Sequence, residues 1–340
     1  MSHPSPDKCK DVLDLSRDPV KHFVRVHGWL QAANSRFAEL GTQGAQREYG
    51  LRYLTLCGKD GIDIFLFKRV GIIKDNGRGF PSVFYCESYE GNFVQVRELL
   101  GKTRSYLGNF EDLVNENLFR EFVIANPFDV VNLDFSGSCF PRADQPFSDT
   151  LRSVTRISEL QKGNEFDLFI TFKALRSAEN NSAITELVLN MEKNFEESNE
   201  IEEKFRTRFG NLAPGDMLEQ DYGKFLLTTF PKIVFGFGSS NGYVVKCPQK
   251  FIYRRTDRRG TNYQIVKFIF SFENLGHSHS FSGTSRRTAE LAAHYKESTL
   301  GDFDVLPLDV YNEVMGNNAL KDELEKDSKS ILESRKAFGT

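Results

Sequence analysis

Apolar residues recur at a helical interval near the start of the chain. Asp18 followed by Pro19 is typical of a helix N-cap with proline in the first turn. Phe23 and Leu30 follow two helical turns apart. The spacing predicts a helix that reaches toward Leu40.

Between residues 51 and 175, short apolar runs alternate with amphipathic segments. The runs that predict strands are LRYLTLCG, PSVFYCES, RSYLGNF, FDVVNLDF and FDLFITFKAL. Helical spacing separates them, for example at Phe93, Val96 and Leu100 before a stop at Gly101. This alternation implies crossover connections and a mainly parallel sheet of about five strands. The run GIDIFLFKRVGII fits either a helix or another strand.

The pattern changes beyond residue 210. KFLLTTFPKIVFGFG fits a helix or a strand, whereas GYVVKCPQKFIYRR and NYQIVKFIFSFE alternate as strands and TDRRGT joins them as a hairpin turn. Residues 275–285 are rich in Gly, Ser and His, which is typical of a loop. The last segment, NNALKDELEKDSKSILESRKAF, predicts a solvated helix with a thin apolar stripe.

Together these elements predict an α/β fold. We expect a Rossmann-like, mainly parallel sheet flanked by helices, with an antiparallel C-terminal hairpin and extra terminal helices. Along the chain we expect a helical segment at 1–50, a Rossmann-like domain at 51–275 and a loop with a helical extension at 276–340.

Composition narrows the classes of function. The net charge of −3 excludes a polycation, so a nucleic-acid partner needs a local basic patch. The five cysteines lie far apart without a C-x-x-C pair, which disfavours a zinc site or a disulfide framework and suits a cytoplasmic protein. No apolar stretch is long enough to span a bilayer, so we expect a soluble protein without a membrane partner. Most of the 31 phenylalanines should fill the core.

Residues after the first two predicted strands are candidates for ligand binding, because ligands of open parallel sheets bind at the carboxyl ends of the strands. Cys57, Gly58 and Gly61 follow the first strand, where glycine lets the backbone approach a ligand; an ordinary turn is the alternative. Glu87 ends the second strand, where a carboxylate suits the hydroxyls of a ribose. The alternative is a surface acid that caps the next helix.

The third and fourth strands end on further candidates. Asn109 and Phe110 could hold an adenine ring by hydrogen bonding and stacking, or form a simple turn with a core phenylalanine. Asp134 ends an almost wholly apolar strand, where its carboxylate could accept hydrogen bonds from a substrate amine while Phe135 or Phe140 stacks on a base. The alternative is an aspartate that caps the following helix.

The order of these polar residues resembles that of the class I S-adenosyl-L-methionine (SAM)-dependent methyltransferases: an acid after strand two, Asn after strand three and Asp after strand four. FDVVNLDFSGS followed by DLFITFKA is similar to the tRNA guanine dimethyltransferases, which act on an exocyclic amine. The resemblance covers about residues 50–275, and the hairpin at 243–273 resembles the closing antiparallel strands of that fold. It implies SAM as cofactor, with Glu87 and Asn109 as contacts, and Asp134 as the acceptor of the substrate amine. The candidate cofactor-binding residues are Cys57, Gly58, Gly61, Glu87, Asn109 and Phe110, and the candidate catalytic residues are Asp134 and Phe135.

The chain also departs from that family. Its first loop is CGKDGID in place of an acidic-x-Gly-x-Gly-x-Gly pattern, and the turn after Asp134 lacks the Asp-Pro-Phe-Gly proline. These departures favour an alternative, a catalytically degenerate module that binds nucleic acid or a protein partner. A different nucleotide-using enzyme on the same sheet is a further alternative, since fold does not fix function.

The predicted hairpin turn carries the best basic patch. Arg254, Arg255, Arg258 and Arg259 are interleaved with aromatic residues such as Tyr263. Cations neutralise phosphates and aromatic rings stack on bases, so the patch predicts RNA or DNA binding. A solvated turn that protects a sheet edge is the alternative.

Other chemistries have less support. His277 and His279 alternate without a third ligand, so we expect no metal site. Serine- and cysteine-nucleophile motifs and a P-loop are absent from the sequence. The charged C-terminal helix is a solvated face or a docking helix for a protein partner.

Overall fold

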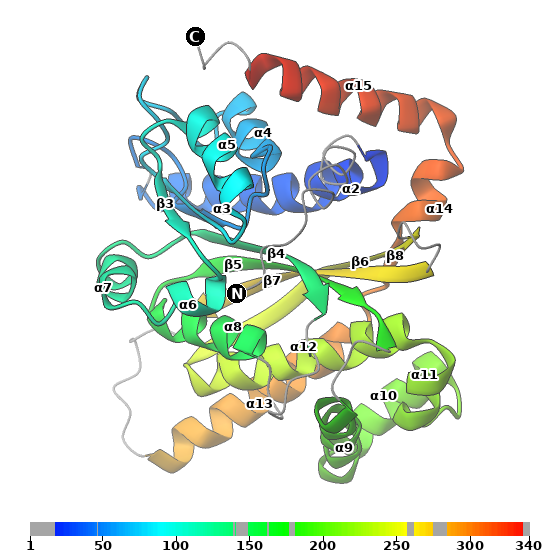
Figure 1. Cartoon of the computed structure of the whole chain (residues 1–340). Coiled ribbons are helices and arrows are strands. Elements are labelled where there is room, and N and C mark those ends of the chain that lie inside the picture. Colours follow the sequence, from blue (N-terminus) through cyan, green and yellow to red (C-terminus); the bar gives the residue numbers. More distant parts are fainter. Residues whose placement is uncertain are drawn as a thin grey trace. The chain divides into compact units, whose positions relative to one another are not determined.

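Strands and helices alternate along the computed structural model. The strands of the described residues pair in the order β3-β2-β1-β4-β5-β7-β6-β8, and helices flank them (Figure 1). The predicted fold class, α/β with a mainly parallel sheet and an antiparallel pair near the C-terminus, is confirmed. The structure describes residues 18–45, 47–138, 140, 149–161, 163–176, 181–256, 262–274 and 284–335.

The chain folds into two compact units, and each combines segments that are distant in sequence. Unit 1 consists of Met1–Leu113, Phe128–Asn132 and Asp309–Thr340, and unit 2 of Val114–Pro127 and Leu133–Leu308. These units are defined by packing, so the domain limits expected at residues 50 and 275 stay a prediction.

Unit 1 contains the first three strands and the start of the fourth. Their bounds are β1 Tyr53–Thr55, β2 Val83–Glu87, β3 Arg104–Leu107 and β4 Val130–Ser138. β1 pairs in parallel with both β2 and β4, so Thr55 lies between Tyr85 and Asn132 in the register. β2 pairs in parallel with β3. The carboxyl ends of β1, β2 and β3 therefore point to the same edge of the sheet, as the sequence predicts.

The helices of unit 1 come from the first 113 residues and from residues 309–340. They are α2 Pro19–Val24, the π-helix η2 Arg25–Leu30, α3 Gln31–Thr42, α4 Ile62–Arg69, α5 Glu90–Leu100, α6 Phe110–Leu113, α14 Val310–Met315 and α15 Asn318–Ser334. Asp18 caps α2 by accepting a hydrogen bond from the Val20 backbone N–H at 2.8 Å, so the predicted N-cap is confirmed. α15 packs on α2 and α4 (Figure 1).

Unit 2 carries the rest of β4 and the antiparallel part of the sheet. Its other strands are β5 Phe166–Ala174, β6 Tyr243–Thr256 and β7 Asn262–Asn274; β8 is Leu308–Asp309. β7 pairs antiparallel with β5 and with β6, which confirms the predicted pair of strands. The joining turn at 257–261 lies outside the described residues.

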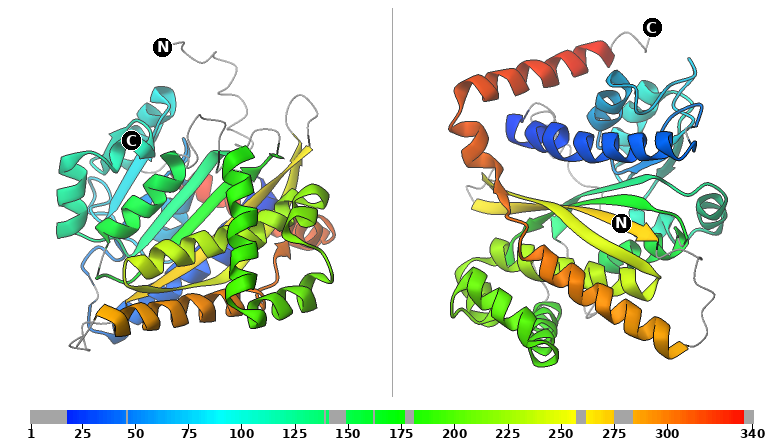
Figure 2. Two further views of the ribbon diagram at one scale, coloured as in Figure 1. Left: turned by 90° about the horizontal axis from the view of Figure 1, so that it is seen from below. Right: turned by 180° about the vertical axis from the view of Figure 1, so that it is seen from behind.

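The helices of unit 2 are α7 Asn117–Ala125, α8 Asp149–Leu160, α9 Asn181–Glu197, α10 Asn199–Phe209, α11 Pro214–Gln220, α12 Tyr222–Ser240 and α13 Thr284–Asp302. Two of them, α12 and α13, pack directly on the antiparallel strands, and the others pack on helices. α12 and α13 pack against each other and on β6 (Figure 2). Phe230 of α12 meets Phe172 and Phe268 at ring-centroid distances of 4.9 and 5.1 Å. Phenylalanine rings thus fill this core, as expected from the composition.

The two ambiguous apolar runs are both helices. α4 buries residues all around its axis, including Ile62, Phe65 and Phe67. α12 does the same and continues through Pro231, after Asp221 caps its start. A helix that is apolar on every side gives no periodic signal, so the pattern alone could not separate it from a strand.

Within the described part of the chain, no helix combines the length and the apolar character needed to cross a membrane.

Candidate functional site at the strand ends of unit 1

A tight glycine turn joins β1 to α4. Gly58 and Gly61 have φ values of +58° and +52°, in the left-handed region where glycine is favoured. The Gly61 N–H donates to the Gly58 carbonyl at 3.3 Å, and Gly61 is the N-cap of α4. The turn therefore brings the free backbone N–H groups of the α4 N-terminus to the carboxyl end of β1.

A buried carboxylate lies directly behind this turn. Asp63, in the first turn of α4, is 3% exposed. Its Oδ2 accepts hydrogen bonds from the Tyr53 hydroxyl at 2.6 Å and the Thr55 hydroxyl at 2.7 Å. The Asn132 amide donates to the same oxygen at 3.3 Å. We call these four residues, Tyr53, Thr55, Asp63 and Asn132, the Asp63 cluster.

The Asp63 cluster has more acceptors than donors. Among the described residues, neither Asp63 Oδ1 nor Asn132 Oδ1 has a hydrogen-bond partner, and both atoms are buried. Burial raises the pKa of Tyr53 well above its usual value, and the Asp63 charge raises it further, so the tyrosine stays a donor. Two buried acceptors are therefore available to a ligand that carries N–H or O–H groups.

A lysine with a mostly buried side chain lies in the same turn. Lys59 is 7% exposed, and its side chain makes no hydrogen bond or ion pair with any residue that the structure describes. Its Nζ is not among the buried unpartnered atoms, so the stem of the side chain is buried while the ammonium keeps contact with solvent. The turn thus presents one positive group without an internal partner among the described residues and, four residues later, one buried carboxylate.

Glu87 ends β2 as predicted, and its side chain is half-buried. Its Oε1 accepts a hydrogen bond from the Tyr89 N–H at 2.9 Å, and the Asn92 amide lies 3.5 Å from Oε2. Burial raises the pKa of Glu87, while the bond from Tyr89 acts in the opposite direction. Each carboxylate oxygen has a second acceptor site, so Glu87 can still receive hydrogen bonds from a ligand.

The candidates after β1 and β2 share one electrostatic environment. Burial raises the pKa of the Cys57 thiol well above its usual value, and the charges of Asp63 and Glu87 raise it further. The Cys86 thiol donates to the Gly108 carbonyl at 3.3 Å, which links the ends of β2 and β3. Because Thr55 pairs with Tyr85 in the parallel register, the Cys57–Gly61 turn and Glu87 follow neighbouring positions of β1 and β2.

The candidates after β3 differ in exposure. Asn109 is exposed, and its amide lies 3.4 Å from Asp112 Oδ2. Phe110 is buried, 3% exposed, at the start of α6. The burial of Phe110 favours the interpretation of this residue as a core phenylalanine. Asn109 is exposed and can contact a ligand.

Asp134 and Phe135 belong to unit 2. Asp134 is 14% exposed, and the Lys267 ammonium lies 3.8 Å from its Oδ1. Lys267 is fully buried, and its ammonium lies 5.7 Å from the centre of the Tyr253 ring. The Lys267 ammonium is therefore a counter-ion for Asp134 within unit 2. A pocket that combines Asp134 with the turn of unit 1 stays a prediction.

Phe140, the alternative stacking ring, is 1% exposed and packs edge-on to Phe230 at 6.4 Å, which is typical of a core residue.

The basic patch is described only in part. Arg254 is exposed, and the Arg255 guanidinium lies 5.9 Å from the Tyr253 ring. The Lys173 ammonium lies 5.0 Å from the Tyr263 ring on the neighbouring strand β7. Arg258 and Arg259, like His277 and His279, lie outside the described residues. Across the described residues, no group of three or more His, Cys, Asp or Glu side chains is arranged to hold a metal ion.

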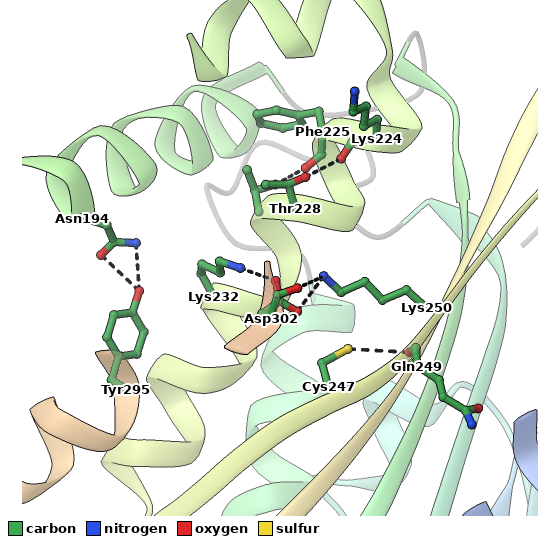
Figure 3. A network of polar contacts seen from close by, with 11 residues as sticks. Asn194, Lys224, Phe225, Thr228, Lys232, Cys247, Gln249, Lys250, Tyr295 and Asp302 are labelled. Atoms are coloured by element: carbon green, nitrogen blue, oxygen red, sulfur yellow. Dashed lines mark hydrogen bonds and ion pairs between the residues drawn. The ribbon is translucent and has the colours of Figure 1, made fainter. Parts of the chain in front are cut away.

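Unit 2 contains a second buried polar cluster, made of Lys232 on α12, Lys250 on β6 and Asp302 on α13 (Figure 3). We call it the Asp302 cluster. Lys250 lies 2.6 Å from Asp302 Oδ1 and 3.2 Å from the Asp302 carbonyl, and Lys232 pairs with Oδ2. Burial lowers the pKa of Lys232 to about 8. Every charged group here has a partner within the chain, which is typical of a structural network.

Sequence reasoning missed Lys59, Asp63 and Asn132. One signal was present, because Asp63 is a single acid inside the apolar run IDIFLF directly after a glycine turn.

No match to this chain was found by a scan against protein-family models or by a search of the curated proteins.

Proposed function

We propose that unit 1 binds SAM at the Cys57–Gly61 turn and that the chain is a SAM-dependent methyltransferase acting on an amine of a nucleic-acid base. The strand order β3-β2-β1-β4-β5 is that of a Rossmann-like sheet, and the antiparallel β6–β7 pair is the feature expected from the resemblance to class I methyltransferases. Fold alone does not carry the proposal, because many functions share this sheet.

The observation that carries it is the pair of groups at the turn that lack partners among the described residues: the Lys59 ammonium, which reaches solvent, and the buried free oxygens of Asp63 and Asn132. The amino-acid part of SAM has one carboxylate and one ammonium. Lys59 suits the carboxylate, and the free oxygens of Asp63 and Asn132 suit the ammonium. Glu87 suits the two ribose hydroxyls at the end of the next strand. When bound, SAM supplies an activated methyl group to the substrate.

This fit also accounts for the unusual first loop. The Lys59 and Asp63 side chains offer charge contacts in place of the missing glycines of the family pattern. Gly58 and Gly61 keep the left-handed backbone that the tight turn requires.

Binding is tested by isothermal titration with S-adenosylhomocysteine and SAM. We expect binding by the wild-type chain and a loss of at least about tenfold in affinity, or about 1.4 kcal/mol, in Lys59→Met and Asp63→Asn. Lys74→Met is the matched control, because Lys74 is an exposed lysine outside the turn. Absence of binding by the wild-type chain contradicts the proposal, and so does an equal loss in the control.

A second candidate function is a methyltransferase-like module that binds RNA, DNA or a protein without turnover. The Lys267–Asp134 pair favours it, because an ion-paired carboxylate is a weaker acceptor for a substrate amine. Methyl transfer from labelled SAM to total RNA and DNA separates the two. Incorporation that is lost in Asp134→Ala supports the enzyme, whereas nucleic-acid or protein capture that is unchanged in Asp134→Ala, without incorporation, supports the module.

A further inference from the structure

The C-terminal helix α15 is attached to both ends of α4. At the last residue of α4, Arg69 donates two hydrogen bonds to Asp327 of α15, at 2.6 and 2.9 Å. Before the first residue of α4, Asp60 accepts from Arg335, which directly follows α15. One helix from the end of the chain thus spans the helix that begins at the glycine turn.

The contact at the turn involves the backbone as well as the side chain. Arg335 Nη1 lies 2.7 Å from the Asp60 carbonyl oxygen and 2.7 Å from Asp60 Oδ1. The two side chains are 15% and 14% exposed. A charge-assisted bond to a partly buried carbonyl restrains the peptide itself, whereas an exposed ion pair restrains only two flexible side chains.

α15 packs on unit 1, and this packing positions Arg335 beside Asp60. Leu324, Ile331 and Leu332 of α15 are buried. The buried His22 of α2 lies 2.8 Å from Asp327. Burial lowers the pKa of His22 to about 4, so the ring is neutral at pH 7. The apolar stripe of α15 is therefore used inside unit 1, and a protein partner on its outer face stays a prediction.

We infer that Arg335 is a positioning residue that holds the Cys57–Gly61 turn in its ligand-binding conformation. Lys59 lies between the two glycines and directly before Asp60, so a restraint on the Asp60 carbonyl also limits the backbone that carries Lys59. The ligand-binding part of this inference depends on the proposed function. Its consequence is that the C-terminal helix controls affinity at a turn that is 275 residues away in sequence.

The test compares Arg335→Met with Arg69→Met, which removes the other α15–α4 ion pair and leaves the turn untouched. Amide hydrogen exchange is measured over residues 57–61, together with S-adenosylhomocysteine titration and the melting temperature. We expect Arg335→Met to exchange at least about tenfold faster in this segment and to bind at least about tenfold more weakly, with only a small change in melting temperature. Arg335→Lys should restore part of both effects, because lysine can reach the same oxygens as a single donor.

Unchanged exchange in Arg335→Met overturns the inference, and so does an equal effect in Arg69→Met, which would indicate general loosening of α15. The exchange measurement needs no ligand. A wild-type chain that fails to bind S-adenosylhomocysteine therefore contradicts the proposed function, while accelerated exchange in Arg335→Met alone still supports the positioning role.

Discussion

The two buried polar clusters differ in how their charges are matched. In the Asp302 cluster, one carboxylate pairs with two lysines, and each charged group has a partner from another element. In the Asp63 cluster, three donors converge on one carboxylate oxygen, and the other oxygen has no partner among the described residues. Buried polar groups are nearly always hydrogen-bonded, and an unsatisfied one costs about 1–3 kcal/mol.

This difference is the basis on which we propose a structural role for the Asp302 cluster and a binding role for the Asp63 cluster. A matched cluster joins elements of the fold, here α12, β6 and α13. An unmatched cluster at the end of a parallel strand, beside a glycine turn, has the chemistry of a ligand site. Both clusters contain a buried aspartate, so residue type and burial alone do not distinguish them.

The largest expected effect is that of Asp302→Asn. The substitution leaves two buried lysines without a counter-charge, so we expect the free energy of unfolding in urea to fall by about 3–5 kcal/mol. Asp304→Asn removes the partner of Lys204 in a pair whose aspartate is 69% exposed, and should cost at most about 1 kcal/mol. If both variants lose the same amount, the Asp302 cluster does not stabilise the fold through its charge match.

The second effect is a pH dependence from Lys232. Its pKa is about 8 in the folded chain, where Asp302, Lys250 and Cys247 face it. In the unfolded chain the pKa is about 10.4. Between these values the unfolded chain binds more protons, so stability rises with pH by up to about 3 kcal/mol. Urea unfolding from about pH 7 to about pH 10 should show this rise in the wild type and lose it in Lys232→Met. Parallel curves would contradict the lowered pKa.

The smallest effect on stability is expected at Asp63. In the ligand-free chain, Asp63→Asn keeps an oxygen for the Tyr53 and Thr55 hydroxyls and removes a buried charge that has no counter-ion among the described residues. We therefore expect a change of no more than about 1 kcal/mol in the free energy of urea unfolding. A loss as large as that of Asp302→Asn would show that the chain itself stabilises the Asp63 charge, and would remove the argument for a ligand.

Strands could be predicted from the sequence where polar turn residues mark both ends of an apolar run. FDVVNLDF and FDLFITFKAL are apolar runs bounded by polar turns, and both form strands. α4 and α12 were ambiguous because burial on all sides removes the helical period. The pattern of apolar and polar residues could not predict the register between strands, because the register depends on contacts between segments distant in sequence.

The candidate site could be predicted only where its residues directly follow a strand. Gly58, Gly61 and Glu87 could be found from their position after a strand. The role of Asp63 depends on the hydroxyls of β1 and the amide of β4, which is 69 residues away in sequence. The contact of Arg335 with Asp60 has no local pattern at all, so only the folded chain reveals it.

The discontinuous make-up of unit 1 has a consequence for folding during translation. The helix that secures the turn after β1 is synthesised only after the ribosome has passed through the whole of Leu133–Leu308. The Cys57–Gly61 turn is therefore synthesised long before Arg335, which contacts it. The antiparallel strands of unit 2 are already complete in the nascent chain by then. The Cys57–Gly61 turn therefore reaches its final contacts later than strands that follow it in the sequence.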